Sequence, residues 1–235
     1  MRCKAIVIGA TSGIGNELVR VLHQNNYVVG ATGRRLGLLR ELKSELQTHI
    51  HIREMDITCI EAQDGLQSLI REMEGVDIIV ISAGTADINI SWEAEKQTVE
   101  TNVVGFTSMA NAAFRYFSHK GSGHLVAISS IAAIRGGVSP SYSASKAYVV
   151  NYLQGLRLLA IKQGNKISIT DIQPGFVDTK MAKGSGLFWV ASPKKAALQI
   201  FSAIKKKRKH AYVTKRWRVI AYLLKMLPDW MYHKL

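Results

Sequence analysis

A tyrosine and a lysine one helical turn apart are the residues of this sequence best suited to chemistry. Tyr142 and Lys146 lie four positions apart in Tyr-Ser-Ala-Ser-Lys, so a helix would place an ammonium beside a phenol. A free phenol titrates near pH ~10, and a nearby cation favours phenolate and lowers that pKa. The pair would then exchange a proton at neutral pH. The same spacing also fits an ordinary helix with a buried Tyr and a solvated Lys, so other motifs must decide.

A glycine-rich turn near the N-terminus is the second motif. An apolar run leads into Gly9-Ala10-Thr11-Ser12-Gly13-Ile14-Gly15, and an amphipathic helix follows. Strand, glycine turn and helix in succession begin a βαβ unit. Gly9 can turn sharply, whereas Gly13 and Gly15 have no Cβ to hold a pyrophosphate away from the backbone. The N-terminus of the next helix can then face phosphates. This predicts a dinucleotide site in preference to a plain glycine turn.

Two adjacent arginines, Arg34 and Arg35, follow the second predicted strand, and residues 30–40 contain no Asp or Glu. NAD sites place an acid here for the ribose 2′-hydroxyl, and NADP sites place arginine for the 2′-phosphate. Adjacent guanidinium groups can make bidentate phosphate bonds. The sequence therefore predicts NADP(H) in preference to NAD(H); the alternative is a solvated surface pair.

Other strand ends supply further cofactor positions. Asp56 and Ile57 follow the third predicted strand, where an adenine ring would lie. Ala83 and Gly84 follow the fourth, and their small size would let a cofactor lie against the strand end. Asn102 falls within a predicted helix, where a buried Asn usually satisfies a local backbone group.

Strands and helices alternate along the whole chain. This predicts an α/β fold, with a doubly wound, mainly parallel Rossmann-type sheet of about seven strands and helices on both faces. We expect strands over residues 4–9, 27–32, 50–53, 77–82, 124–129, 166–172 and 211–213. We expect the longer helices over residues 36–47, 92–118, 142–162 and 193–204. Residues 1–213 would form one dinucleotide-binding domain and residues 214–235 a basic, amphipathic helical extension of it.

Composition narrows the class of protein. The chain has 235 residues, 47% of them hydrophobic, which fits one domain with a sizeable core. We expect no signal peptide, since Met1 runs at once into a strand, and no apolar run reaches the ~18 residues that span a bilayer. Cys3 and Cys59 are too few for a disulfide framework, so we expect two buried thiols in a reducing compartment. The seven histidines show no metal spacing, and we expect no metal. A cytoplasmic location is expected, with membrane association left open.

These motifs together resemble the short-chain dehydrogenase/reductase family, in its short single-domain branch. The resemblance covers about residues 4–213, and its motifs occur in the family's order. The family's glycine-rich turn is matched by Gly9, Gly13 and Gly15. Its catalytic tetrad is matched by Asn102, Ser130, Tyr142 and Lys146. Its segment for the nicotinamide end is matched within residues 174–179, where we expect cofactor contacts from Pro174, Gly175, Val177 and Thr179.

The serine of the tetrad is uncertain by one position. The family's usual spacing of thirteen residues before Tyr142 gives Ser129. The match to Ser-Ile-Ala-Ala, and the use of the second serine of such a pair, give Ser130. We expect Ser130, with a one-residue deletion in the loop before Tyr142.

The resemblance implies an oxidoreductase that interconverts a carbonyl and an alcohol. Ser130 and Tyr142 would bind the carbonyl oxygen, NADPH would supply hydride and Tyr142 would donate the proton. Lys146 would lower the pKa of Tyr142 and hold the nicotinamide ribose, and Asn102 would hold a water that links Lys146 to solvent. The family also implies a homodimer or homotetramer that pairs through the helices over residues 92–118 and 141–162. A dinucleotide-binding module without turnover is the alternative, and the intact tetrad disfavours it.

The substrate is expected to be a small carbonyl or alcohol. Residues 181–192 would form a loop over it, with an apolar wall of Leu187, Phe188, Trp189 and Val190. Such a wall fits an apolar compound but selects no particular one.

A basic C-terminal segment carries most of the net charge of +14. Residues 200–235 contain ten Lys and Arg against Asp229 alone, a net charge of +9. Trp217, Ile220, Leu224 and Leu227 recur at helical spacing, and Pro228 would end the helix. This segment would either pack on the domain or a partner subunit, or lie in an anionic membrane surface. Nucleic-acid binding through the lysine run at residues 205–209 is disfavoured, because such runs are usually solvated helix ends.

Overall fold

The computed structural model describes residues 2–87, 89–179, 181 and 188–232. In these residues seven parallel strands form one sheet with the order β3-β2-β1-β4-β5-β6-β7. Its strands are β1 (Lys4–Ile8), β2 (Val28–Gly33), β3 (Ile50–Glu54), β4 (Ile78–Ile81), β5 (Ser122–Ile128), β6 (Lys166–Pro174) and β7 (His210–Val213). The α-helices are α1 (Gly13–Gln24), α2 (Leu36–Leu46), α3 (Ala62–Glu72), α4 (Trp92–Val99), α5 (Phe106–Lys120), α6 (Pro140–Lys162), α7 (Pro193–Lys205), α8 (Trp217–Met226) and α9 (Asp229–Tyr232).

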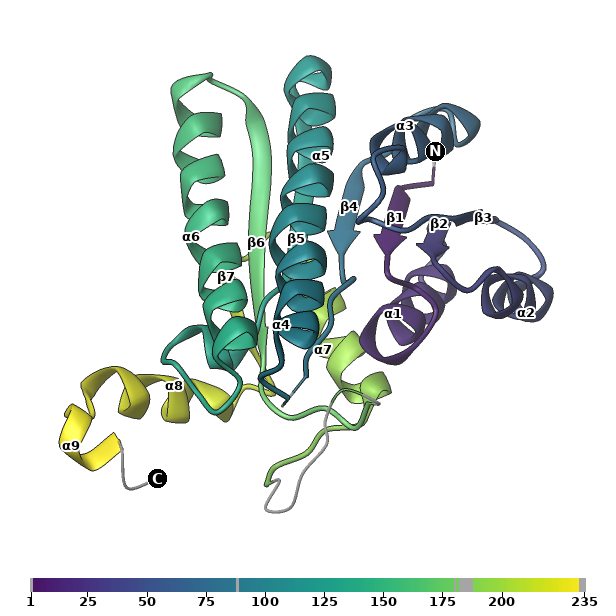
Figure 1. The fold of residues 1–235 in the computed structure, drawn as a ribbon. Helices are drawn as coiled ribbons and strands as arrows, with labels where there is room; N and C mark the ends of the chain where they lie inside the picture. Colours follow the sequence, from purple (N-terminus) through teal and green to yellow (C-terminus); the bar gives the residue numbers. More distant parts are fainter. Residues whose placement is uncertain (1, 88, 180, 182–187, 233–235) are drawn as a thin grey trace.

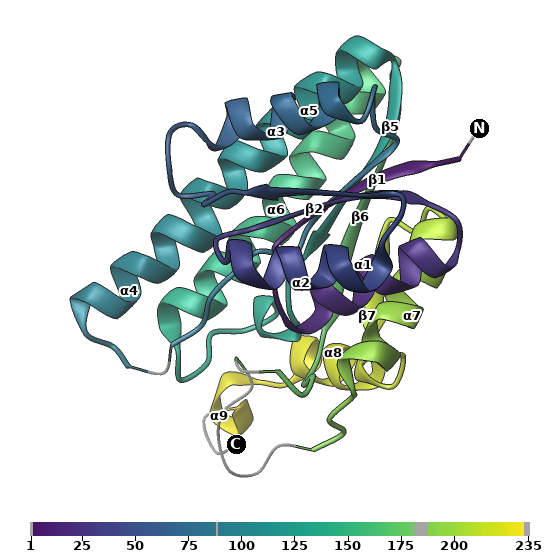
Figure 2. The same cartoon turned by 90° about the vertical axis from the view of Figure 1, so that its right-hand side faces the viewer.

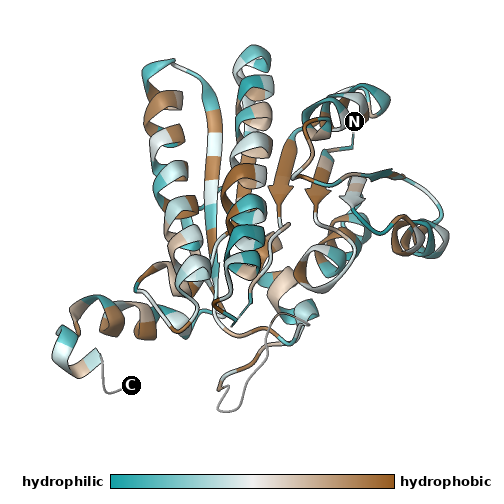
Figure 3. Ribbon diagram, in the orientation of Figure 1, coloured by the Kyte–Doolittle hydropathy of each residue, from teal (hydrophilic) through white to brown (hydrophobic). Residues whose placement is uncertain are grey.

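Helices cover both faces of the sheet, which confirms the predicted architecture (Figures 1 and 2). Successive side chains of a strand point to opposite faces, so β1 contributes to two cores. Ala5 and Val7 pack in the core with α1, α2 and α7, whereas Ile6 and Ile8 pack in the core with α3, α5 and α6. Figure 3 shows the corresponding pattern, with apolar strands β1 and β4 between helices of mixed hydropathy.

The strand order reverses between β1 and β4. After β1 the chain adds β2 and then β3 on one side, and it crosses back to place β4 on the other side. The loops after β1 and β4 therefore diverge at the carboxyl ends of adjacent strands. In open α/β sheets this switch point opens the crevice where ligands bind.

The helix predicted over residues 92–118 is not one regular α-helix. Its middle, Glu100–Gly105, winds as a π-helix between α4 and α5. Short π segments often mark functional sites, and this one contains Asn102. The spacing of apolar residues does not reveal such a segment. Asn102 within it makes tertiary contacts that are described below. Helix α3 has no counterpart among the predicted elements.

The prediction of two buried cysteines is wrong. Cys3 and Cys59 are both exposed. Cys3 lies just before β1, and Cys59 lies in the turn between β3 and α3, where its N–H donates to the Asp56 carbonyl over 3.2 Å. Because both thiols are exposed, they do not support an inference about the cellular compartment.

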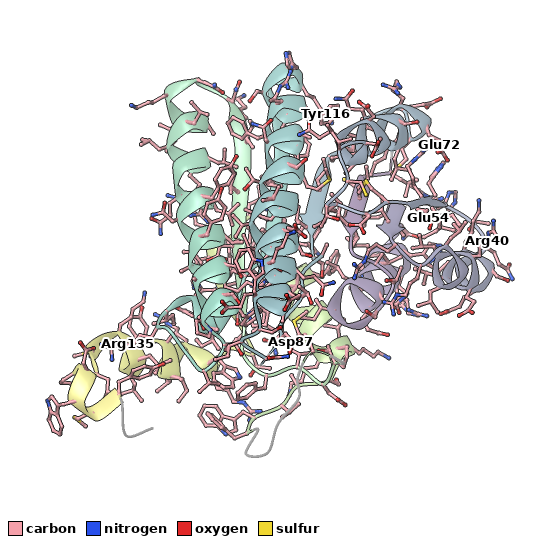
Figure 4. The ribbon with its side chains drawn as sticks, in the orientation of Figure 1. Arg40, Glu54, Glu72, Asp87, Tyr116 and Arg135 are labelled. Carbon is pink, nitrogen blue, oxygen red and sulfur yellow. The ribbon has the colours of Figure 1, made fainter. Side chains whose placement is uncertain are left out.

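The C-terminal extension folds onto the domain through one face of α8. Trp217 is 3% exposed and Ala221 is fully buried. A Cβ on Gly175 would lie 2.0 Å from the Trp217 ring, so only glycine leaves room for that indole. Further along, Asp229 pairs with Arg135 at 2.8 Å, and Figure 4 shows Arg135 beside this part of the chain. The face of α8 that contains Trp217 and Ala221 therefore packs on the domain, as one of the two alternatives for the extension predicts.

Candidate active site

A cleft of about 510 Å³ opens at the carboxyl ends of the central strands. It is lined by every predicted cofactor residue except Gly15 and Asn102, and by Ser129, Ser130, Tyr142 and Lys146. Other residues that were not predicted also line it, among them Met55, Ser82, Thr85, Ala86, Thr101 and Ile128. The switch point of the sheet therefore brings the glycine turn and the Tyr-Lys pair into one cavity.

Close packing explains the glycine turn. Gly9 has φ +93°, and a Cβ on it would lie 2.5 Å from the Ala83 backbone nitrogen at the end of β4. Gly13 has φ +55°, and a Cβ there would lie 3.0 Å from Thr179. These two positions line the cleft and let the backbone approach a ligand.

Gly15 does not line the cleft, which corrects its predicted role against a pyrophosphate. A Cβ on Gly15 would lie 2.1 Å from the Gly9 carbonyl oxygen. Its missing side chain instead lets α1 pack against the end of β1, the role that a third glycine has in such turns.

The N-terminus of α1 has a geometry that can hold an anion. Ser12 is the N-cap residue but forms no side-chain capping bond, and the first turn contains no acidic residue. The free N–H groups and the positive end of the helix macrodipole therefore face the cleft. Arg35 adds a cation, because its Nη2 donates to Thr11 Oγ1 over 2.7 Å and to Ser12 Oγ over 2.9 Å.

The other arginine, Arg34, has a different partner. Arg34 Nη1 lies 3.9 Å from Asp56 Oδ2 across the mouth of the cleft, and both side chains are partly exposed. The carboxylate offsets part of the Arg34 charge. Ile57, next to Asp56, packs so closely on Gly105 that a Cβ there would lie 2.8 Å from Ile57 Cγ1. Positive charge at this end of the cleft is therefore carried more fully by Arg35.

The structure brings Ser130, and not Ser129, to Tyr142. Ser130 makes a side-chain hydrogen bond with Tyr142, and its Oγ also accepts from the Ala132 N–H over 3.1 Å. Ser130 is the N-cap of the 3₁₀ turn Ile131–Ala133, and that turn aims its hydroxyl into the cleft. Ser130 therefore lies where a group that acts on Tyr142 would be needed, and the one-residue deletion stays a prediction.

Ser129 belongs to a buried network behind the cleft. Its hydroxyl donates to Asp171 Oδ1 and to the Ile172 carbonyl, the latter over 3.0 Å. The other oxygen of Asp171 accepts from Gln173 Nε2 over 3.0 Å and pairs with His210 Nδ1 at 2.9 Å. This network joins β5, β6 and β7, so the Ser129 side chain serves the sheet.

Lys146 is a buried cation, with 5% of its surface exposed. Its Nζ donates to the Ile128 carbonyl over 3.1 Å and lies 5.7 Å from the centre of the Tyr142 ring. Burial lowers the pKa of Lys146 to about 8, and the negative charge of Asp171 opposes part of that shift. The ammonium is therefore close to titration at physiological pH.

Burial also raises the pKa of Tyr142, while the Ser130 hydrogen bond opposes that rise. The expectation of a lowered tyrosine pKa is thus wrong for the chain's own groups. The desolvation of a phenolate outweighs the attraction of an ammonium whose hydrogen bond points to Ile128. Lowering this pKa needs a further positive charge in the cleft.

Asn102 holds the loop after β4. Its Nδ2 donates to the Thr85 carbonyl over 2.7 Å and to Ser145 Oγ over 3.1 Å, and its Oδ1 accepts from the Thr85 N–H over 2.9 Å. A Cβ on Gly84 would lie 3.2 Å from both Asn102 Oδ1 and Lys146 Nζ. The π segment, the β4 loop and α6 therefore converge beside the lysine.

The remaining wall comes from residues 174–179. The Ala191 N–H donates to the Phe176 carbonyl over 3.0 Å, and Val177 forms a bridge with Ala191. Phe176 packs edge-to-face on Trp217, with ring centres 5.3 Å apart. The family resemblance ends before Trp217, so it does not predict that this indole supports the wall of the cleft. The signal in the sequence is Gly175, because only glycine leaves room for the indole.

Titratable side chains elsewhere do not form a metal centre. Within the described part of the chain, no group of three His, Cys, Asp or Glu side chains lies close enough to hold a metal ion.

A pH-dependent stability follows from the buried ammonium. Between pH ~8 and ~10.5 the unfolded chain keeps the Lys146 proton while the folded chain releases it, so stability rises with pH in this window. We expect the unfolding free energy of the wild type, relative to Lys146→Met, to rise by about 1 kcal/mol per pH unit across it. Urea unfolding of both proteins at several pH values measures this difference, and parallel curves would contradict it.

Comparisons with known proteins agree with this geometry. Residues 4–187 match the family model described as short chain dehydrogenase. An uncharacterized oxidoreductase of Mycobacterium tuberculosis is 30% identical over 242 residues, covering 97% of this chain and 94% of the relative. An NADP-dependent 3-hydroxy acid dehydrogenase of Escherichia coli is 34% identical over 181 residues, covering 73% and 71%.

A solved structure of another protein has the same fold. Serine dehydrogenase complexed with NADP+ in its closed form superposes with a TM-score of 0.76 and 26% identity, over 85% of this chain and 88% of the other. The family model, the relatives and the shared architecture agree. The chain belongs to the short-chain dehydrogenase/reductase family of oxidoreductases.

Proposed function

We propose that this protein is an NADP(H)-dependent oxidoreductase that interconverts a carbonyl and an alcohol. The observation that carries the proposal is the convergence of Tyr142, Ser130 and Lys146 in the same cleft as the glycine turn. One end of that cleft can hold an anion and the other can move a proton. Carbonyl reduction by hydride transfer needs both.

The residues of the cleft fit a nicotinamide dinucleotide. The uncapped N-terminus of α1 suits the pyrophosphate, and the close approach at Gly9 and Gly13 leaves the backbone accessible. Asp56 and Ile57 line the adenine end, and the segment with Val177 and Thr179 lines the opposite end. When bound, the dinucleotide supplies or accepts the hydride at the carbon.

The chain's own groups act on the oxygen. In reduction, the hydroxyls of Ser130 and Tyr142 donate hydrogen bonds to the carbonyl oxygen and so stabilise the negative charge that develops there. Tyr142 then transfers its proton to that oxygen, and in oxidation it takes the proton back. A raised phenol pKa favours the donor form, so the ground state of Tyr142 suits reduction.

Lys146 sets the electrostatics of this transfer. As Tyr142 loses its proton, the phenolate gains the attraction of the ammonium in a buried, weakly screened environment. An oxidised nicotinamide would add the further positive charge that the chain's own groups lack. We propose that Lys146 also holds the nicotinamide ribose and that Asn102 takes part in a water relay from Lys146 to solvent. The observed bonds of Asn102 support a holding role, and the relay is a proposal.

The preference for NADP(H) is proposed on the charge at the end of β2. Arg34 and Arg35 lie there, and Arg35 already contacts the Thr11 and Ser12 hydroxyls. A 2′-phosphate would add negative charge next to both guanidinium groups. The names of the E. coli relative and of the serine dehydrogenase structure, which contain NADP, support this choice.

We propose an apolar substrate. Phe188, Trp189 and Val190 are half exposed, and Phe188 stacks on Trp217 with ring centres 5.1 Å apart. These rings continue from Phe176, which lines the cleft. Leu187, predicted to join this wall, lies outside the described residues.

We also propose a homo-oligomer. Helix α6 has Leu158 and Leu159 exposed at 56% and 41%, and α4 has Trp92 exposed at 72%. Apolar side chains at these positions on helices fit pairing with a second copy about a twofold axis. The family resemblance favours a dimer or tetramer through the same helices.

Loss of the phenol hydroxyl tests the proposed function. A panel of aldehydes and ketones, scored by NADPH oxidation, first identifies a substrate. Tyr142→Phe removes the proton donor and little else, so kcat should fall by at least about a hundredfold while NADPH binding persists. Activity within about tenfold of wild type would remove Tyr142 from this role, and failure of the wild type on every carbonyl would favour the non-catalytic binding module.

The two serines form a matched pair. Ser130→Ala should lower kcat strongly because it removes a donor to the carbonyl oxygen. Ser129→Ala should leave kcat nearly unchanged but cost about 1–3 kcal/mol of stability, since Asp171 loses a buried donor. Kinetics and urea unfolding on both variants separate the roles, and a reversed order would place Ser129 at the substrate.

The arginines test the cofactor preference. Arg34→Ala and Arg35→Ala should each weaken NADPH more than NADH, by about 1.5–3 kcal/mol where the charged bonds are well made. Arg35→Ala should have the larger effect, because Asp56 offsets the Arg34 charge. Nicotinamide fluorescence titrations give the six dissociation constants of the wild type and the two variants for NADPH and NADH. Equal affinity of the wild type for both cofactors would contradict the preference.

A further inference from the structure

Helix α8 carries an apolar stripe that faces away from the domain. Val219, Tyr222, Leu223 and Met226 follow the spacing i, i+3, i+4 and i+7, which places them on one helix face. Their exposed fractions are 59%, 53%, 57% and 81%. We call these four residues the outer stripe.

The orientation of the outer stripe is fixed by the opposite face of the helix. Trp217 and Ala221 are buried, and Trp217 fills the space over Gly175. The start of α8 is thus anchored in the domain core. Beyond α8, Asp229 pairs with Arg135 and the Tyr232 hydroxyl donates to the Gly136 carbonyl, both in the loop before α6. With its inner face buried in this way, α8 presents the outer stripe to solvent.

Cations flank the outer stripe. Lys215, Arg216, Arg218 and Lys225 are all exposed, and Arg218 lies 5.6 Å from the centre of the Tyr222 ring. Residues 214–235 contain one acidic residue, Asp229, and it is paired with Arg135. The surface around the stripe is therefore apolar in the middle and positive around it.

The same surface continues onto the loop beside the cleft. Arg216 lies 5.0 Å from the centre of the Trp189 ring, and Trp189 and Phe188 both contact the Trp217 ring. Phe188, Trp189 and Val190 are 41–47% exposed. Two segments thus present half-buried or exposed apolar side chains next to cations.

We infer that the outer stripe and its flanking cations bind the surface of an anionic lipid bilayer, with α8 lying in the plane of the interface. An amphipathic helix with Lys and Arg beside its apolar face binds in this way, through apolar burial and attraction to anionic headgroups. Helix α8 has ten residues, a length that suits a position along a membrane surface. Within the described residues, no helix is long and apolar enough to span a bilayer. The inference does not depend on the proposed activity.

Charge favours lipid over a second copy of the chain on this face. A twofold pairing would bring each stripe, with the same four cations, against its own copy. Like charges facing each other cost binding energy. An anionic bilayer instead neutralises them.

The test is partition of the intact chain onto vesicles, followed by flotation. Vesicles of phosphatidylcholine with phosphatidylglycerol should bind it, vesicles of phosphatidylcholine alone should bind it much less, and salt should weaken the binding. Leu223→Glu combined with Met226→Glu should lower the partition coefficient at least about tenfold, since two apolar side chains can no longer enter the interface. Arg218→Gln combined with Lys225→Gln should lower it roughly fivefold for each lost cation.

A matched control adds the same two carboxylates elsewhere. Ile60→Glu combined with Leu198→Glu changes side chains that are 90% and 50% exposed, outside the tail, and should bind vesicles like the wild type. All six substituted side chains point to solvent, so circular dichroism should show unchanged folds.

The inference is overturned if the intact chain does not bind anionic vesicles at low salt, or if both tail variants bind as well as wild type. It is also overturned if neutral and anionic vesicles bind equally. A dimer that depends on Leu223 and Met226 by light scattering, without vesicle binding, would assign the stripe to a second copy instead.

Discussion

The burial of the Lys146 ammonium is the constraint on which the site depends. An unpaired charge inside a protein is costly, and here the Ile128 carbonyl and the charge of Asp171 offset part of that cost. Each compensating group occupies a fixed place in the sheet. A side chain at Gly84 would approach both Lys146 and Asn102 closely. The loop after β4, the end of β5 and a carboxylate of β6 therefore surround the cation.

Close packing also determines the geometry at the other end of the cleft. The packing of Gly9 on Ala83 and of Gly15 on Gly9 brings α1 against the switch point of the sheet. The free helix N-terminus and the buried cation then lie in a single cavity. This close packing places the free helix N-terminus and the Tyr142–Lys146 pair along one cleft, as the proposed function requires.

Local signals in the sequence predicted the layers and the strands, because apolar alternation, glycine turns and the ends of parallel strands carry them. With the family resemblance they also predicted cofactor residues of which all but Gly15 and Asn102 line the cleft. The features of the fold and the site that the sequence did not predict depend on tertiary contacts. The π segment contains Asn102, whose side chain binds Thr85, and the raised pKa of Tyr142 follows from burial that no spacing encodes. Trp217 likewise lies far from Gly175 in sequence, and only the fold brings the indole over that glycine.

The central claim is that this cleft transfers hydride to a carbonyl while the chain supplies the proton. NADPH carrying deuterium at the transferable position of the nicotinamide tests it most directly, in a single turnover with a carbonyl substrate followed by mass spectrometry of the product. The account predicts an alcohol with deuterium bound to the carbinol carbon. Oxidation of the labelled NADPH without a deuterated alcohol would contradict it.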